Sequence, residues 1–147
     1  MRINKSKAAG FTLIEILVVV ALIAILAAVT IIAINPAKNF ADTRNSTRSA
    51  DVTAILNAVT QYTSEQGNAL SDFGTIETCP DVSTVGTGVG NINLSTLLVD
   101  EFIVAIPLDP STGTAADTGY TICQTTGARV QIDAPDAENG KVISVRR

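Results

Sequence analysis

Histidine and tryptophan are absent from this 147-residue chain, aromatic residues make up 4% of it, and it has two cysteines. Without histidine, the chain lacks the side chain most often used as a general base near neutral pH and as a metal ligand. No group of carboxylates in the sequence forms a recognisable catalytic set. We therefore expect no enzymatic activity, no structural zinc and no cofactor.

Positive charge is also scarce, with ten Lys and Arg residues against fourteen Asp and Glu residues. Three of the ten, Arg2, Lys5 and Lys7, come before Gly10, so the rest of the chain has a formal side-chain charge of −7. An acidic domain is a poor ligand for the nucleic-acid backbone. We expect no direct nucleic-acid site, although Arg146-Arg147 is a local basic pair.

The most prominent feature that is present is an apolar run from Ile16 to Ile34, in which only Thr30 is polar. As a helix this run would be about 28 Å long, enough to cross a bilayer core. A secretory signal peptide cut after Ala27-Ala28 is an alternative, but the apolar core of such a peptide has only about 7–15 residues. We therefore predict a single-pass anchor. Because positive residues stay cytoplasmic, the C-terminal part should lie outside.

Glu15 lies at the start of this run. A charged side chain is unfavourable there, by about 2.5–3.5 kcal/mol at a helix centre and by less near the interface. An ordinary membrane anchor has no need of such a residue. The sequence therefore indicates that Glu15 has a specific partner.

The segment Gly10-Phe11-Thr12-Leu13-Ile14-Glu15, between a short basic leader and a long apolar run, resembles the class III signal motif of type IV prepilins. That family includes the pseudopilins of type II secretion. The resemblance implies that a prepilin peptidase cleaves between Gly10 and Phe11 and methylates the new amino group of Phe11. It also implies that Glu15 pairs with the N-terminal amine of a neighbouring subunit during assembly.

The chemistry of the two groups favours this pairing independently of the family. A carboxylate among apolar helices is unstable alone, and an adjacent amine supplies the opposite charge. The resemblance further implies subunits held in the cytoplasmic membrane, which the pilus assembly machinery builds into a homo-oligomeric helical filament outside the cell. Pili of this family serve adhesion, twitching motility and DNA uptake.

The resemblance divides the chain into a leader (1–10), a hydrophobic helix (11–34), an amphipathic continuation (35–67) and a globular β head (68–147). Pro36 should interrupt the helix near residues 32–36. Beyond it, an apolar stripe indicates a helix face, while polar residues cover the opposite face. The stripe consists of Val52, Ile55, Leu56, Val59 and Tyr62, and the polar face of Asp51, Asn57, Gln61 and Glu65.

The polar stretch Asn39–Ser49, with Arg44 and Arg48, is either a solvated face or a contact between subunits. In the head, short β-rich runs predict strands, and Thr125-Thr126-Gly127 predicts a hairpin turn. Together with the long helix this gives an α+β fold with a small antiparallel sheet, which matches the pilin fold by resemblance. We expect a short helix that Ser95 caps and strands at 73–77, 102–106, 119–124, 128–133 and 141–146.

Cys79 and Cys123 should form one disulfide, because two cysteines outside the cytoplasm most simply pair with each other. Two reduced thiols are the alternative. The bond would close a long loop and stabilise the fold by about 4 kcal/mol.

The segment Pro107–Gly113, which contains Asp109 and is followed by Asp117, has oxygen ligands of the kind that calcium prefers. Major pseudopilins have a calcium loop in a similar region, also near an Asp-Pro pair. The spacing matches no firm motif, and an ordinary turn containing proline and aspartate explains the segment as well.

Three functions compete: a subunit of an extracellular type IV pilus, a pseudopilin of a secretion or DNA-uptake system, and a solitary membrane-anchored binding module. Glu15 and the leader argue against the third. The Asp-Pro loop favours a pseudopilin, whereas the cysteine pair and the loops rich in Thr, Ser and Gly favour a pilin. We expect a pilus subunit.

Overall fold

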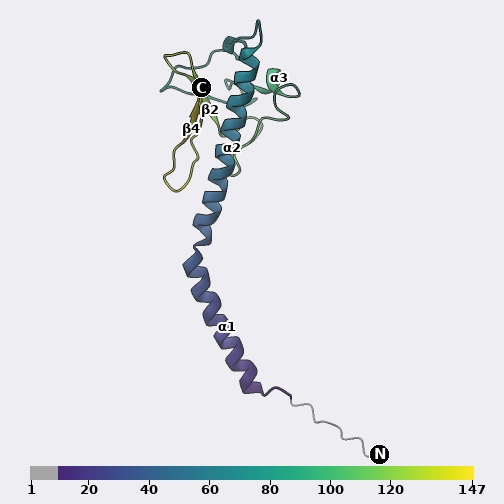
Figure 1. The fold of residues 1–147 in the computed structure, drawn as a ribbon, viewed down its shortest axis with the longest axis vertical. Helices are drawn as coiled ribbons and strands as arrows, with labels where there is room; N and C mark the ends of the chain where they lie inside the picture. The colour runs from purple at the N-terminus through teal and green to yellow at the C-terminus, as the bar shows by residue number, and fades with distance from the viewer. Residues whose placement is uncertain (1–9) are drawn as a thin grey trace, which may run out of the picture. The chain divides into compact units, whose positions relative to one another are not determined.

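The computed structural model describes residues 10–147 and divides the chain into two compact units, one ending at Asn39 and the other running from Phe40 to Arg147 (Figure 1). The leader charges at Arg2, Lys5 and Lys7 lie outside the described residues. The first unit contains helix α1 (Leu13–Ile34) and the first turn of α2 (Pro36–Ser64). The second unit, which we call the head, contains the rest of α2 and everything after it.

Helix α1 is long and apolar enough to cross a membrane, with 22 residues and a mean hydropathy of 3.3 over its most apolar window. At 1.5 Å per residue its length is about 33 Å. The Thr30 hydroxyl donates to the Leu26 carbonyl oxygen at 2.8 Å, so this polar group is satisfied within the helix.

The predicted interruption near Pro36 is confirmed, and it is placed at Asn35. Asn35 ends α1 in the left-handed conformation (φ 46°), which asparagine tolerates better than most residues. Its side-chain Oδ1 then accepts a hydrogen bond from the Lys38 backbone N–H at 3.3 Å, which caps α2. Pro36 occupies the first helical position, where its missing N–H has no intrahelical partner to lose.

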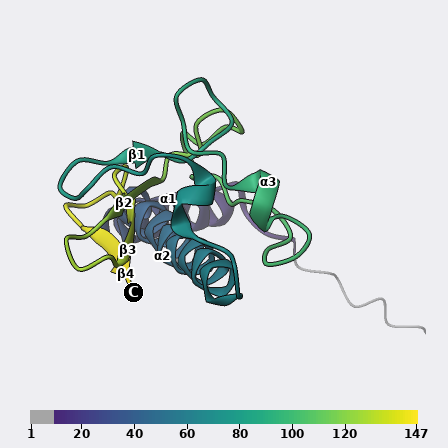
Figure 2. The same cartoon turned by 90° about the horizontal axis from the view of Figure 1, so that it is seen from above.

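The apolar stripe of α2 forms the centre of the head core, as predicted. Val52, Ile55 and Val59 have no exposed surface, and Leu56 and Tyr62 are buried beside them. One sheet packs along one side of α2, and the short helix α3 (Ser95–Leu98) lies on the other (Figure 2). The head is therefore α+β, as the sequence predicts.

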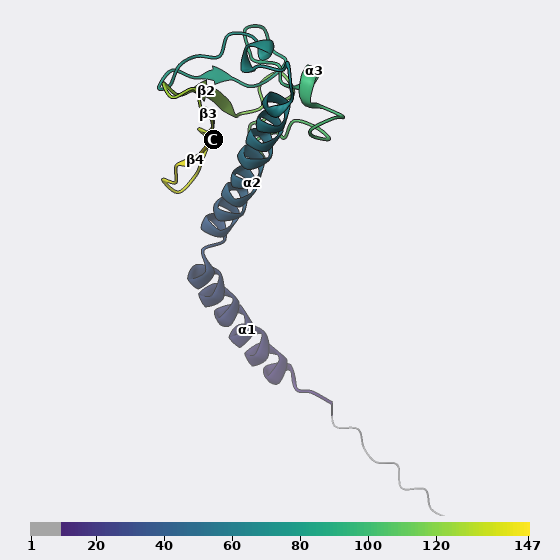
Figure 3. The same ribbon diagram turned by 45° about the horizontal axis from the view of Figure 1, so that its top comes forward.

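The sheet is a four-stranded antiparallel meander in the order β1-β2-β3-β4. Its strands β2, β3 and β4 lie next to one another beside α2 (Figure 3). The hairpin at Thr125-Thr126-Gly127 joins β2 to β3, and Ile122 and Ile132 face each other on the core side. The strands are β1 (Ser83–Thr84), β2 (Thr121–Gln124), β3 (Val130–Ala134) and β4 (Ile143–Arg146).

Two predicted strands are wrong. Residues 102–106 form no strand and contribute one isolated bridge, at Ile103, while Phe73 ends the 3₁₀ helix η1 (Leu70–Phe73). Phe73 and Phe102 both pack on the Tyr62 ring, with ring centroids 4.9 and 5.7 Å away. Their hydrophobic character therefore serves the core and not strand pairing.

Two details of local structure also differ from expectation. Ser95 is the first residue of α3 and not its cap, because the Asn93 side chain accepts the Ser95 N–H at 3.1 Å. Strand β1 lies outside the predicted strands, and it is two residues long, too short to be recognised from alternation.

Cys79 and Cys123 form a disulfide that closes a loop with a sequence separation of 44 residues. Beside it, the Cys79 backbone N–H donates to the Gln124 carbonyl oxygen at 3.0 Å. Strand β1 and the segment before it thus cover the outer edge of β2, which blocks pairing with other chains there.

Candidate functional site

The N-terminus of α1 is closed by a capping box between Thr12 and Glu15. The Glu15 backbone N–H donates to Thr12 Oγ1 at 3.3 Å, and the Thr12 backbone N–H reaches Glu15 Oε2 at 3.5 Å. Such reciprocal bonds satisfy two donors that a helix start otherwise leaves free. The Glu15 carboxylate therefore has a local partner within its own chain, in addition to any partner in a neighbouring subunit.

Gly10 and Phe11 lie just before this cap and outside the helix. A Cβ atom placed on Gly10 would meet nothing within 4 Å, so the described fold imposes no steric need for glycine there. Phe11 is 78% exposed. The peptide bond between these two residues is accessible to an external enzyme, and a preference for glycine would have to come from that enzyme.

No residue of α1 is buried within the described chain. Its large apolar side chains are largely exposed, with Leu13 at 83% and Ile32 at 81%. Exposed apolar surface of this extent marks a membrane or protein contact. The helix therefore requires a lipid or protein environment outside its own chain.

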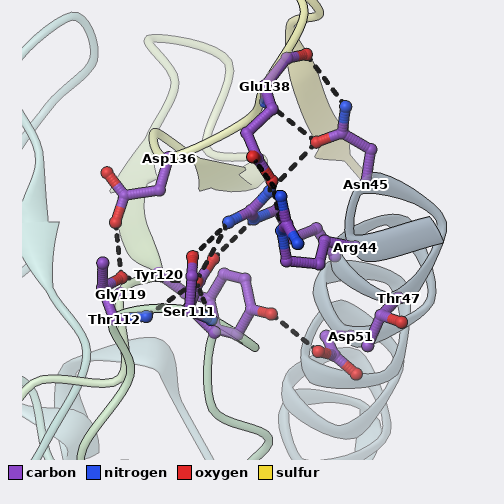
Figure 4. A network of polar contacts seen from close by, with 12 residues as sticks. Arg44, Asn45, Thr47, Asp51, Ser111, Thr112, Gly119, Tyr120, Asp136 and Glu138 are labelled. Atoms are coloured by element: carbon purple, nitrogen blue, oxygen red, sulfur yellow. Dashed lines mark hydrogen bonds and ion pairs between the residues drawn. The ribbon is translucent and has the colours of Figure 1, made fainter. Parts of the chain in front are cut away.

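A second candidate site is a polar cluster on the first half of α2, within the head (Figure 4). We call it the Arg48 cluster, and its members are Arg44, Asn45, Arg48, Asp109, Ser111 and Glu138. The Arg48 side chain is fully buried and forms a bidentate ion pair with Asp109, through Nε to Oδ2 at 2.6 Å and Nη2 to Oδ1 at 3.1 Å.

The remaining donors of Arg48 are also satisfied. Its Nη1 donates to Asn45 Oδ1 at 3.1 Å and to Glu138 Oε2 at 2.9 Å, and its Nη2 donates to Ser111 Oγ at 2.7 Å. A guanidinium has five N–H donors, so every one has a partner. Within residues 10–147, no buried side-chain nitrogen or oxygen lacks a hydrogen bond.

The loop between β3 and β4 completes the cluster. Glu138 accepts both Arg44 Nη2 and Arg44 Nε at 2.6 Å, and its backbone N–H and carbonyl oxygen both bond the Asn45 side chain at 2.9 Å. The cluster thus joins α2, the segment around Asp109 and the last loop of the head. It holds three parts of the chain that are distant in sequence.

These contacts shift the acidity of the carboxylates. Burial alone would raise the pKa of Asp109, but the hydrogen bonds from Arg48 and Ser111 outweigh it and hold that pKa well below its usual value. Hydrogen bonds from Arg44 and then Arg48 lower the pKa of Glu138 to about 2. Both groups are therefore ionised at neutral pH, and the cluster acts as a set of fixed charges and not as a proton donor.

Asp109 was a calcium candidate with Asp117, and its carboxylate oxygens are already occupied. Besides Arg48, the Ser111 backbone N–H donates to Oδ1 at 2.8 Å and the Thr112 backbone N–H at 3.1 Å. Asp117 instead caps its own turn through the Gly119 N–H at 2.9 Å. No group of three or more potential metal-ligating residues occurs in the part of the chain that the structure describes. Calcium binding stays a prediction.

Both interpretations of Asn39–Ser49 missed the intramolecular role of this segment. The buried residues Ala41, Asn45 and Arg48 continue the spacing of the apolar stripe at Val52 and Ile55, in steps of four and three residues. This regular spacing was the available signal. Asp51, predicted to be on the polar face, accepts a hydrogen bond from the buried Tyr120 hydroxyl at 2.6 Å.

One comparison with known proteins matches the N-terminal segment. Residues 5–33 match the family model described as the prokaryotic N-terminal methylation motif, which is the class III signal peptide of type IV pilin-like proteins. No curated protein matches the chain, and no solved structure matches it. The matched residues include Gly10, Phe11 and Glu15 and most of α1.

The motif supports a type IV pilin-like or pseudopilin protein, which belongs to a structural and not an enzymatic class. It implies processing by a prepilin peptidase and assembly into a pilus-like filament. Together with the apolar helix α1, it fits a membrane-anchored pilin.

Proposed function

We propose that this chain is the structural subunit of an extracellular type IV pilus, without catalytic activity. In this proposal a prepilin peptidase cleaves between Gly10 and Phe11 and methylates the Phe11 amine. The subunit waits in the cytoplasmic membrane with its head outside, and it polymerises through α1. The observation that carries the proposal is that the methylation motif runs directly into an apolar helix that buries none of its residues within the described chain.

Cleavage and assembly are coupled in this proposal. The Phe11 amine exists only after the leader has been removed. A neighbouring Glu15 can then exchange its weak 3.5 Å bond to the Thr12 N–H for an ion pair with that amine. A subunit out of register would leave one charge unpaired among apolar helices, which is strongly unfavourable. Processing would therefore control assembly, and the ion pair would set the axial register.

A pseudopilin of a type II secretion or DNA-uptake system is the alternative. The Asp109-Pro110 segment favours it, because major pseudopilins have a calcium loop near an Asp-Pro pair. The ion pair of Asp109 with Arg48 argues against a pseudopilin, since calcium would have to displace Arg48 from the Asp109 carboxylate. The disulfide suits a filament surface that is exposed outside the cell.

Electron microscopy of material sheared from the cell surface, with mass spectrometry of the filament subunit, tests the proposal. We expect long filaments whose subunit begins at a methylated Phe11. Short filaments confined to the cell envelope would support the pseudopilin instead. A subunit that retains residues 1–10 in the filaments would contradict the proposed processing.

A further inference from the structure

Three arginines gather at one edge of the head sheet. The Arg147 backbone N–H donates to the Val130 carbonyl oxygen at 3.0 Å, and the Val130 N–H donates to the Arg147 carbonyl oxygen at 2.9 Å. Arg129, which precedes Val130, therefore lies at the same end of the sheet as Arg147. Arg146 pairs with Gln131, which places Arg129 and Arg146 diagonally on the outer face of the sheet. Diagonal neighbours of this kind lie about 7–8 Å apart.

These residues, which we call the arginine edge, are exposed. The other cations of the head, Arg44, Arg48 and Lys141, all form ion pairs within it. The arginine edge forms no ion pair with the described residues, although Arg147 Nη1 donates a hydrogen bond to Asn57 Oδ1 on α2 at 3.2 Å. Arg129 and Arg146 are thus two diagonal cations without an intramolecular counter-charge, in a chain with an excess of acids. Their grouping makes this edge a surface that suits an anionic partner.

A matching surface lies after α3. Residues Asp100–Val104 line a shallow hollow of about 280 Å³, with two exposed carboxylates, Asp100 and Glu101, followed by apolar residues. Val104 is 90% exposed. A guanidinium on an aliphatic stem fits such a surface, because the stem can cover apolar atoms while the planar head bonds carboxylates.

The two surfaces lie on opposite sides of the head. In Figure 2, the sheet edge that ends at the C-terminus is on one side of α2, and α3 with its following loop is on the other. One head therefore cannot pair these surfaces with each other. Two heads can, and each pairing leaves one arginine edge and one acidic hollow free. A head-to-tail contact of this type extends into rings or open helical filaments.

We infer that the arginine edge of one subunit docks on the acidic hollow, residues 100–104, of a second copy of this chain. This inference rests on the proposed filament function and adds a contact between heads to the contact between α1 helices. The charges steer each incoming head into one orientation, because like-charged surfaces repel in the others.

Charge reversal in full-length protein tests this contact. The variant Arg129→Glu/Arg146→Glu should lower filament yield at least about tenfold, because it juxtaposes like charges, and so should Asp100→Lys/Glu101→Lys. Co-expression of the two variants should restore filaments, since each variant then offers the surface that the other requires. The matched control Glu77→Lys/Asp81→Lys changes two exposed acids elsewhere on the head and should assemble normally.

A second measurement separates this inference from the filament proposal. Membranes containing Arg146→Cys/Glu101→Cys protein are treated with a short thiol-reactive cross-linker, and the native cysteines stay protected in their disulfide. We expect a ladder of cross-linked copies, and no ladder from Arg146→Cys/Glu77→Cys. A ladder without filaments would contradict the filament proposal and leave the contact standing.

Two results would overturn the inference. One is wild-type filament yield from both charge-reversal variants without a ladder. The other is retardation of double-stranded DNA by wild-type filaments that the Arg129→Glu/Arg146→Glu variant loses while it assembles normally. That second result would assign the arginine edge to a nucleic acid.

Discussion

At the scale of single residues, Glu15 has one partner in its own chain, the Thr12 N–H, and a proposed second partner, the Phe11 amine of a neighbouring subunit. The two partners require different properties of the side chain at position 15. Capping the Thr12 N–H needs only a hydrogen-bond acceptor, which glutamine also provides. Pairing with the Phe11 amine needs a negative charge. The capping box therefore explains a polar residue at this position but not an acid.

We predict that Glu15→Gln keeps α1 intact and inserted in the membrane but strongly reduces filament yield, and that Glu15→Val reduces it as much. Quantification of subunit in sheared and membrane fractions would measure both. The matched control is Thr12→Ala, which removes the cap and leaves the carboxylate. Wild-type yield from Glu15→Gln would show that capping, and not charge, is the role of this residue.

Arg48 is a buried charge whose two carboxylate partners, Asp109 and Glu138, both come from distant parts of the head. We predict that Arg48→Met lowers the free energy of unfolding by about 3–5 kcal/mol, because Asp109 then remains buried without its counter-charge. The double variant Arg48→Met/Asp109→Leu, which replaces both members of the ion pair, should lower the free energy of unfolding by less than Arg48→Met alone.

Denaturant unfolding of the detergent-solubilised chain, followed by circular dichroism, would measure these differences. Arg129→Met removes an exposed arginine of the same head and should change stability by less than about 0.5 kcal/mol. If Arg48→Met behaved like Arg129→Met, the Arg48 cluster would contribute little to the stability of the head.

At the scale of elements, the sequence predicts the parts whose patterns are local. The apolar stripe of α2, the break before Pro36 and the hairpin after β2 each follow from spacing or turn chemistry within a few residues. The Arg48 cluster could not be predicted in this way, because Arg48 meets Asp109 and Glu138 across 61 and 90 residues. Sequence alone shows that a polar residue occupies the buried face, but not which acid meets it.

The disulfide acts on the element that covers the edge of β2. We predict that Cys79→Ser/Cys123→Ser lowers the free energy of unfolding by about 4 kcal/mol, because the unfolded chain gains the entropy of a long open loop. The same unfolding measurement, with and without reductant, would test it. Reductant should lower the free energy of unfolding of the wild-type chain and leave that of the variant unchanged. Two thiols that react in unreduced protein would contradict the bridge.

At the scale of the whole molecule, the ion pairs set the response of the head to acid. The carboxylates of Asp109 and Glu138 bind protons more readily in the unfolded chain than in the folded one, because their folded pKa values are lowered. Their stabilising contribution is complete above a pH of about 5 and is lost as the pH falls through the folded pKa values.

We therefore predict that the denaturant midpoint changes little between pH 7 and about 5 and falls steeply between about 4 and 2. Unfolding curves over this range would measure the fall. A Glu138→Gln variant should start with a lower midpoint and show a shallower fall. Equal slopes for the variant and the wild type would place the acid sensitivity elsewhere in the head.

The long sequence separation within the Arg48 cluster also affects how the chain matures during synthesis. Arg48 is made 61 residues before Asp109 and 90 residues before Glu138. Until both have been synthesised, the first half of α2 carries a guanidinium that lacks its two carboxylate partners. Only a chain synthesised through the loop between β3 and β4 can supply both carboxylates to Arg48.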